Sequence, residues 1–117
     1  MKDKQYSMYY CHVNSWWWGK SVDIVRKDGI GVICVKYDDK YPSTAFICDL
    51  SVLELYRHNG IGGELMKKAL EVAKDNCKSF AELQVDKAKN ELVAWYTDLG
   101  FDITYIDEHE YTMMKVL

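Results

Sequence analysis

The stretch Arg57-His58-Asn59-Gly60-Ile61-Gly62-Gly63 lies between an apolar, strand-like run that ends near Leu55 and a helical pattern that begins near Gly60. Arg-x-x-Gly-x-Gly at a strand-to-helix junction is suited to holding a diphosphate. Glycines let backbone N–H groups approach an anion, and a helix start offers unpaired N–H groups and a partial positive charge. An arginine adds a bidentate phosphate contact. The stretch therefore predicts a nucleotide-bearing cofactor, although a tight turn into a helix would also account for the glycines.

Length and composition describe a small, acidic, globular protein. The chain has 117 residues, 49% of them hydrophobic and 28% charged, and a formal net charge of −3. We expect residues 1–117 to form one domain. The charge disfavours nucleic acid as a partner, because that function needs a basic face. No apolar run reaches the roughly 18 residues of a membrane span, and the N-terminus lacks the shape of a signal peptide, so we expect no membrane association and a cytoplasmic location.

The four cysteines are Cys11, Cys34, Cys48 and Cys77, and no two of them have C-x-x-C spacing. The three histidines are far apart in the sequence as well. We therefore predict no metal site. Cys34 and Cys48 lie in apolar, strand-like runs and are predicted to be buried free thiols, in keeping with a reducing compartment.

The order of periodic segments predicts a mixed α/β (α+β) domain. The run Thr44–Leu53 is nearly continuous in apolar residues, which is typical of a central strand. Lys27-Asp28-Gly29 is a hairpin-turn sequence, whereas Ser15–Ser21 has no clear assignment. Strands are expected at residues 5–14, 22–26, 30–37, 44–53, 80–85, 101–106 and 111–116.

Two helices are expected, one beginning near Gly60 and one over residues 89–99. The apolar face of the first is formed by Ile61, Leu65, Ala69, Leu70 and Ala73, which recur at helical spacing. In the second helix Leu92, Tyr96 and Leu99 fall on one side with Val93 adjoining them, and Gly100 is the stop signal.

Three stretches together carry a family resemblance. They are Leu50–Gly62; Leu83–Val85 followed by Asn90, Ala94, Tyr96 and Gly100-Phe101; and the ending Tyr111–Leu117. In order and spacing they resemble the pyrophosphate motif, the asparagine and tyrosine pattern and the last strand of the GNAT superfamily of acetyl-CoA-dependent N-acetyltransferases. The resemblance covers about Val22–Leu117. It implies a central, mostly antiparallel sheet that is splayed at the cofactor site and flanked by helices.

The resemblance also implies roles for individual residues in acetyl transfer from acetyl-CoA to a small-molecule or peptide amine. The backbone of Leu50, Ser51 and Val52 would pair with pantetheine, and Asn90 would lie beside it. Tyr96 would be the general acid at the sulfur. The pyrophosphate would be held by Arg57, Gly60, Ile61, Gly62 and Gly63. Taken alone, Tyr96 fits a core position equally well, and Asn90 fits a helix start.

The general base is less defined by the sequence. Asp49, Glu54, Glu82 and Asp86 all lie near predicted strand ends. We take Asp49 as the first candidate. A chain of water molecules is an alternative, and an acceptor with a low pKa would need no base.

The front of the chain departs from the family pattern. GNAT domains usually carry two helices between their first two strands, whereas only Ser15–Ser21 is available here, so the acceptor remains unnamed. Trp16, Trp17 and Trp18 are candidates for an acceptor pocket, a dimer contact or core packing, and a homodimer would rebuild a wall around a shortened site. The rival functions are a non-catalytic CoA-binding or interaction module, and a structural domain without a ligand.

Overall fold

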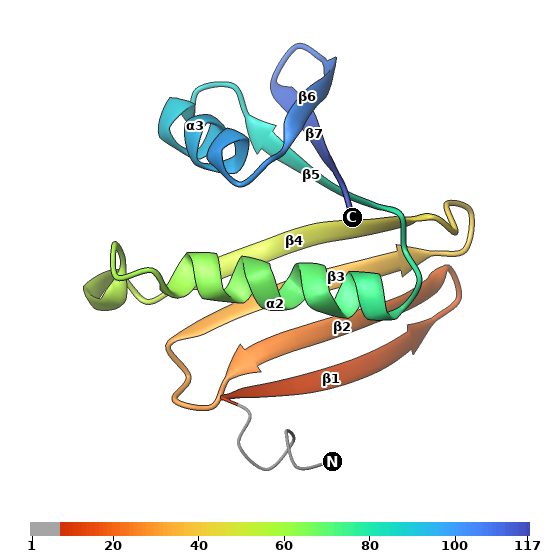
Figure 1. Cartoon of the computed structure of the whole chain (residues 1–117), viewed down its shortest axis with the longest axis horizontal. Helices are drawn as coiled ribbons and strands as arrows, with labels where there is room; N and C mark the ends of the chain where they lie inside the picture. Colours follow the sequence, from red (N-terminus) through yellow and green to blue (C-terminus); the bar gives the residue numbers. More distant parts are fainter. Residues whose placement is uncertain (1–7) are drawn as a thin grey trace.

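The computed structural model describes residues 8–117, which form a seven-stranded sheet and two α-helices (Figure 1). The strand order is β1-β2-β3-β4-β5-β7-β6. The elements are β1 (Tyr9–Trp16), β2 (Gly19–Arg26), β3 (Gly31–Asp38), β4 (Thr44–Val52), the short 3-10 helix η1 (Glu54–Tyr56), α2 (Ile61–Asp75), β5 (Phe80–Asp86), α3 (Asn90–Asp98), β6 (Asp102–Ile106) and β7 (Glu110–Val116). The mixed, mostly antiparallel sheet predicted from the sequence is confirmed.

The first two strands form a hairpin where the sequence left Ser15–Ser21 unassigned. β1 continues to Trp16, which pairs with Gly19 at the start of β2. The expected end of the first strand at residue 14 is therefore wrong, because the tryptophans prolong the strand into its turn; aromatic residues favour extended backbone. Residues 5–7 of that expected strand lie outside the described part of the chain.

β4 lies in the middle of the sheet, as its nearly continuous apolar run predicts. It pairs with β3 in antiparallel fashion and with β5 in parallel fashion, but the β5 pairing covers only three pairs, from Thr44–Phe80 to Phe46–Glu82. The register with β3 shifts between Val32 and Cys34, which marks a β-bulge in this pair. Asp49 lies in that part of β4 and has φ 55°, so the strand bends where it leaves β5.

α2 crosses one face of β2, β3 and β4 (Figure 1). Its predicted apolar face is confirmed: the buried residues are Ile61, Leu65, Met66, Ala69 and Ala73, and Leu70 packs against them. Gly31 allows the start of the helix to approach β3, because a Cβ at that position would lie 2.6 Å from Leu65 Cδ1. This close packing places the first turn of α2 beside the end of β4.

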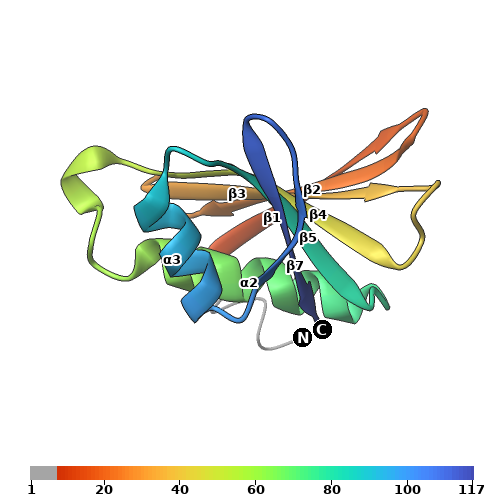
Figure 2. The same ribbon diagram turned by 90° about the horizontal axis from the view of Figure 1, so that it is seen from above.

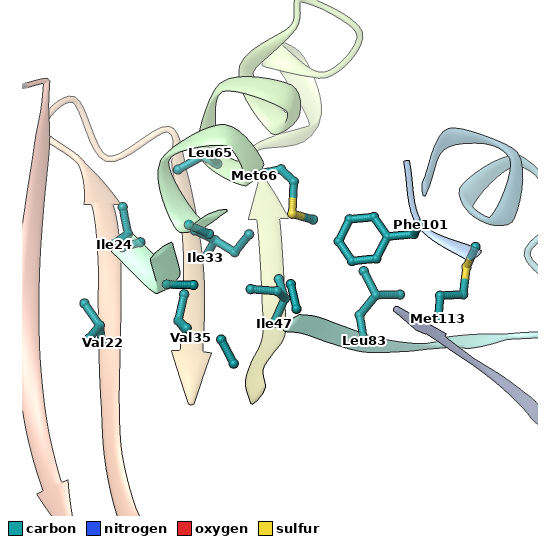
Figure 3. Packing of buried hydrophobic residues seen from close by; sticks show 14 of the residues in the cluster. Val22, Ile24, Ile33, Val35, Ile47, Leu65, Met66, Leu83, Phe101 and Met113 are labelled. Atoms are coloured by element: carbon teal, nitrogen blue, oxygen red, sulfur yellow. The ribbon is translucent and has the colours of Figure 1, made fainter. Parts of the chain in front are cut away.

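The C-terminal segments extend the same core. Figure 3 shows Met66 of α2 and Ile47 of β4 beside Leu83 and Phe101, and Met113 completes this end of the cluster. Phe101 and Met113 are fully buried. Gly100 directly follows Leu99, the C-cap of α3, and has φ 96°, as predicted for the stop signal of this helix.

The predicted inner face of α3 needs a correction. Leu92 is 38% exposed, whereas Val93, Trp95, Tyr96 and Leu99 pack against the core. Spacings of three and four residues are both compatible with a helix face, so Tyr96 and Leu99 can be joined with either Leu92 or Val93. The packing against the core decides in favour of Val93.

No helix of the described residues covers the face of β1–β4 that is opposite α2 (Figure 2). The side chains on this face come from the strand positions that alternate with those packed against α2, among them Cys34, Lys36 and Phe46. None of the helices in residues 8–117 is long and apolar enough to cross a membrane.

Candidate cofactor and acceptor site

The predicted phosphate loop leads directly into α2. Gly60 is the N-cap in the left-handed region with φ 82°, and the helix begins at Ile61. The N–H groups of Ile61, Gly62 and Gly63 lie in the first turn, where an α-helix has no acceptors of its own for them. A Cβ at Gly63 would meet nothing within 4 Å, so this side of the first turn is open. The first turn therefore offers backbone donors to an anion.

Two charged side chains adjust the electrostatics of this helix start. Glu64 would oppose an anion, but its carboxylate pairs with the guanidinium of Arg26 at 3.3 Å. Arg57 lies on the exposed loop, where Nε donates a 2.9 Å hydrogen bond to the carbonyl oxygen of Val52. The loop thus brings one anchored arginine to the place where β4 ends and α2 begins.

The second half of β4 borders an open gap in the sheet. Leu50–Val52 follow the last residue that pairs with β5, while Ser51 and Val52 still pair with Val32 and Gly31 on the other side. Backbone groups on the β5 side of this segment therefore have no strand partner. An amide-bearing ligand that enters the gap would find the hydrogen-bond pattern of a missing strand.

Tyr96 and Asn90 come from α3, on the β5 side of the gap. The Tyr96 ring lies 5.2 Å from the Trp95 ring and 6.1 Å from the Phe101 ring, measured between centroids. Partial burial raises the pKa of its hydroxyl. Asn90 is the first residue of α3 but does not cap it, since the N-cap is Lys89 and no side-chain cap bond forms. Both residues are where the sequence placed them, and their contact with a cofactor stays a prediction.

Two neighbouring hollows open on the face opposite α2. One, of about 310 Å³, is lined by Asn14, Trp16, Trp18, Ser21, Asp23, Cys34, Lys36 and Asp49. The other, of about 390 Å³, is lined by Trp18, Lys36, Asp38, Tyr41 and Phe46. Neither reaches the loop 57–63, but Asp49 links the first hollow to the segment Leu50–Val52 that follows it in β4.

The three tryptophans do not act as one group. Trp16 and Trp18 stack with ring centroids 6.1 Å apart, and Trp16 Nε1 donates a 2.8 Å hydrogen bond to Ser21 Oγ. Trp17 is 93% exposed at the tip of the β1–β2 hairpin. Two indoles therefore build a wall of the hollow, and the third points away from it.

The four carboxylates that are candidates for the general base lie in different surroundings. Asp49 lines the 310 Å³ hollow. Glu82 sits opposite Phe46 at the last β4–β5 pair, and burial raises its pKa. Glu54 is exposed in η1, and Asp86 accepts a 2.8 Å hydrogen bond from the Ala88 backbone N–H. Asp49 and Glu82 are thus the carboxylates near the gap.

The structure also brings together groups that the sequence did not connect. Cys34 and Cys48 are opposite each other on β3 and β4, and their Sγ atoms and a carboxylate oxygen of Asp49 lie within 4.8 Å of one another. Both are free thiols, as predicted; Cys34 is buried, as expected, whereas Cys48 is only half-buried. Burial raises the pKa of Cys34 to about 12 and also raises that of Cys48. The spacing of these residues along the sequence does not indicate the cluster, whereas the pairing of β3 with β4 does.

Most of the sequence matches a protein-family model. The model of the acetyltransferase (GNAT) family matches residues 2–101. The chain belongs to this family, which makes it a member of a class of acyl-transferring proteins. No curated protein sequence is significantly similar to it.

Solved structures of the same fold include proteins of this family. The IAA acetyltransferase from Bacillus cereus is 24% identical, with a TM-score of 0.73, over 83% of this chain and 78% of that chain. A GNAT family acetyltransferase from Elizabethkingia anophelis, solved with acetyl-CoA bound, is 15% identical, with a TM-score of 0.73, over 95% of this chain and 99% of that one. The PaiA N-acetyltransferase from Thermoplasma acidophilum, in complex with coenzyme A, is 21% identical, with a TM-score of 0.71, over 83% of this chain and 60% of that chain. At these identities the likeness concerns the fold.

Proposed function

We propose that this protein transfers the acetyl group of acetyl-CoA to an amine, and that the gap between β4 and β5 holds the donor. The observation that carries the proposal is the parting of β4 from β5 after Phe46, next to a glycine-rich helix start with an anchored arginine. Structures of the same fold with acetyl-CoA or coenzyme A bound support it.

The donor would be held along its length by groups of different kinds. Its pyrophosphate would accept hydrogen bonds from the first-turn N–H groups of α2 and from the Arg57 guanidinium. Its pantetheine amides would pair with the free side of Leu50–Val52, and Asn90 would lie beside this arm. The thioester would then sit between β4 and α3. This route needs no metal and no other cofactor.

The chemistry requires one proton acceptor and one proton donor. An alkyl ammonium has a pKa near ~10.4 and must lose a proton before its nitrogen attacks the thioester carbon. We assign that proton to Asp49, with Glu82 as the second candidate because its raised pKa lies closer to neutral pH. As the C–S bond breaks, the Tyr96 hydroxyl would protonate the leaving thiolate. The raised pKa of Tyr96 keeps that proton in place before transfer.

The hollow opposite α2 supports an amine as the acceptor. Its wall contains the stacked indoles of Trp16 and Trp18, and its carboxylates are Asp23 and Asp49. Indole faces and carboxylates both attract an ammonium group. Lys36, which also lines the hollow, would disfavour an acceptor with several cationic groups close together.

The test is the release of free thiol from acetyl-CoA in the presence of a panel of amines, with binding of acetyl-CoA measured by calorimetry on the same sample. Thiol release that saturates with one of the amines, and acetylation of that amine by mass spectrometry, is the expected result. Binding without release on every acceptor would support a non-catalytic CoA-binding module. Absence of binding would leave a structural domain and overturn the proposal.

A further inference from the structure

We propose that Cys34, Cys48 and Asp49 form a binding site for a thiophilic divalent cation such as Zn²⁺. The site lies in the floor of the hollow opposite α2. It rests on the ligand atoms themselves and not on the cofactor gap. A metal-bound Asp49 could not also accept the proton of the amine, so in the metal-bound protein that role would pass to Glu82, the second candidate.

The geometry of the sheet brings the three ligand atoms together. Cys34 and Cys48 are direct partners across β3 and β4, so their side chains project from the same face. The irregular register beside them accompanies the left-handed backbone of Asp49, whose carboxylate lies with the two thiols although it is the next residue along the strand. In a regular strand neighbouring side chains point to opposite faces. The bulge is therefore what adds the third ligand.

The distances are close to those of a bound metal. The three ligand atoms lie within 4.8 Å of one another. Tetrahedral ligation with Zn–S bonds of about 2.3 Å and Zn–O bonds of about 2.0–2.2 Å places neighbouring ligand atoms roughly 3.5–3.8 Å apart. The ligand atoms would therefore have to approach one another by no more than about 1.3 Å. Small side-chain rotations can supply this, so β3 and β4 need not move.

The kind of ligand selects the kind of ion. Two sulfurs and one carboxylate oxygen suit Zn²⁺ or Co²⁺, whereas Mg²⁺ and Ca²⁺ prefer all-oxygen sites. On binding, each thiol releases its proton to solvent and the sulfur donates to the metal as a thiolate. Three protein ligands leave a fourth position for water, facing the hollow of about 310 Å³ through which an ion would enter.

A further carboxylate supports the cluster from the neighbouring strand. Asp23 is the partner of Cys34 in the β2–β3 register and lines the same hollow. Its position is held by Asn14, whose Nδ2 donates a 3.1 Å hydrogen bond to Asp23 Oδ2. Asp23 is thus placed to accept a hydrogen bond from the metal-bound water.

The test is titration of the reduced, metal-free full chain with Co²⁺, followed by displacement with Zn²⁺. We expect one Co²⁺ per chain, a near-ultraviolet thiolate-to-cobalt band and loss of that band when Zn²⁺ is added. Two variants serve as the test. Cys34→Ser should abolish the band, and Asp49→Asn should weaken Co²⁺ binding at least ~10-fold. Asn accepts the positive φ of this position, so Asp49→Asn keeps the fold.

The chain offers a matched control in its other two cysteines. Cys11 and Cys77 are exposed and do not belong to the cluster, so Cys11→Ser/Cys77→Ser should keep both the band and the one-to-one stoichiometry. No thiolate band in the wild-type chain would overturn the proposal. A band that persists with unchanged affinity in Asp49→Asn and Cys34→Ser, or one that disappears in the control variant, would overturn it as well. None of these readouts involves acetyl-CoA, so this result and that of the acetyl-transfer assay are independent.

Discussion

The side chain of Arg57 is tied to the end of β4, because its Nε donates a 2.9 Å hydrogen bond to the carbonyl oxygen of Val52. This bond joins the loop to the strand segment that borders the gap. Within residues 8–117 the two terminal nitrogens of Arg57 make no hydrogen bond or ion pair. The guanidinium is therefore oriented by one nitrogen and free to bind an anion with the others.

Replacing Arg57 should weaken the binding of acetyl-CoA. We expect Arg57→Ala to raise its Kd by ~10- to ~100-fold, the equivalent of about 1.5–3 kcal/mol for a charged hydrogen bond. Arg57→Lys is the matched control. It keeps the charge but loses the forked guanidinium and its hydrogen bond to Val52, so its Kd should lie between those of the wild type and Arg57→Ala. Calorimetry at fixed ionic strength measures all three. Equal Kd values in the three proteins would remove Arg57 from the site.

Gly63→Ala should change stability and binding in opposite directions. Alanine is more favourable than glycine inside a helix by about 0.5–1 kcal/mol, and the added methyl would meet nothing within 4 Å. The free energy of unfolding should therefore stay the same or increase. The methyl would occupy the space of the bound pyrophosphate, so the Kd of acetyl-CoA should rise by roughly 10-fold, about 1.4 kcal/mol.

Gly60→Ala is the contrast to that variant, measured by urea denaturation and calorimetry. Its φ of 82° disfavours any side chain, so it should lower the free energy of unfolding by about 1–2 kcal/mol. If Gly63→Ala binds acetyl-CoA as tightly as the wild type, the first turn of α2 does not hold the pyrophosphate.

Tyr96→Phe should lower turnover and leave the donor affinity nearly intact. Loss of a positioned general acid typically costs ~10²- to ~10⁴-fold in rate. The ring contacts with Trp95 and Phe101 remain in this variant, so we expect little change in thermal stability. Because burial raises the pKa of Tyr96, its deprotonation should not limit kcat below about pH 10. Steady-state thiol release against pH measures both effects, and an unchanged kcat would assign Tyr96 to core packing alone.

The stability of the fold should decline at alkaline pH. Burial raises the pKa of Cys34 from 9.0 to about 12 and that of Tyr37 from 10.0 to about 12. Below about pH 8 both groups are largely protonated in either state, so they add little pH dependence there. Between their unfolded and folded pKa values the unfolded chain loses the protons first, and the free energy of unfolding falls. Urea denaturation at about pH 8 and about pH 10.5 measures this decline. Tyr37→Phe should make it smaller, and a decline of the same size would contradict the assignment to Tyr37.

The parts of the fold that were predictable from sequence are those with a local cause. The nearly continuous apolar run Thr44–Leu53 predicted the central position of β4, and the helical spacing of apolar residues predicted the buried face of α2. The hairpin turn was predictable because Asp28-Gly29 is a turn sequence, and Gly29 has the positive φ, 76°, that such a turn requires. Leu92 and Val93 were not separable, since both fit a helix face with Tyr96 and only the packing against the core distinguishes them.

The candidate site likewise contains features with a local cause in the sequence and features that depend on long-range contacts. The phosphate loop is contiguous, so Arg57 and the glycines could be read together. The cluster of Cys34, Cys48 and Asp49 depends on the pairing of β3 with β4 and on the bend at Asp49, neither of which has a short-range signal. The hollow behind Trp16 and Trp18 arises because no helix of the described residues covers that face, and sequence alone did not tell which tryptophan lines it.

A crystal structure of the chain with coenzyme A tests the central claim most directly. The pyrophosphate should contact the backbone N–H groups of Gly62 and Gly63 and the Arg57 guanidinium, and the pantetheine should run between β4 and β5 along Leu50–Val52. The sulfur should lie near the Tyr96 hydroxyl. Coenzyme A bound away from this gap, or a pyrophosphate that contacts neither Arg57 nor the first turn of α2, would contradict the account.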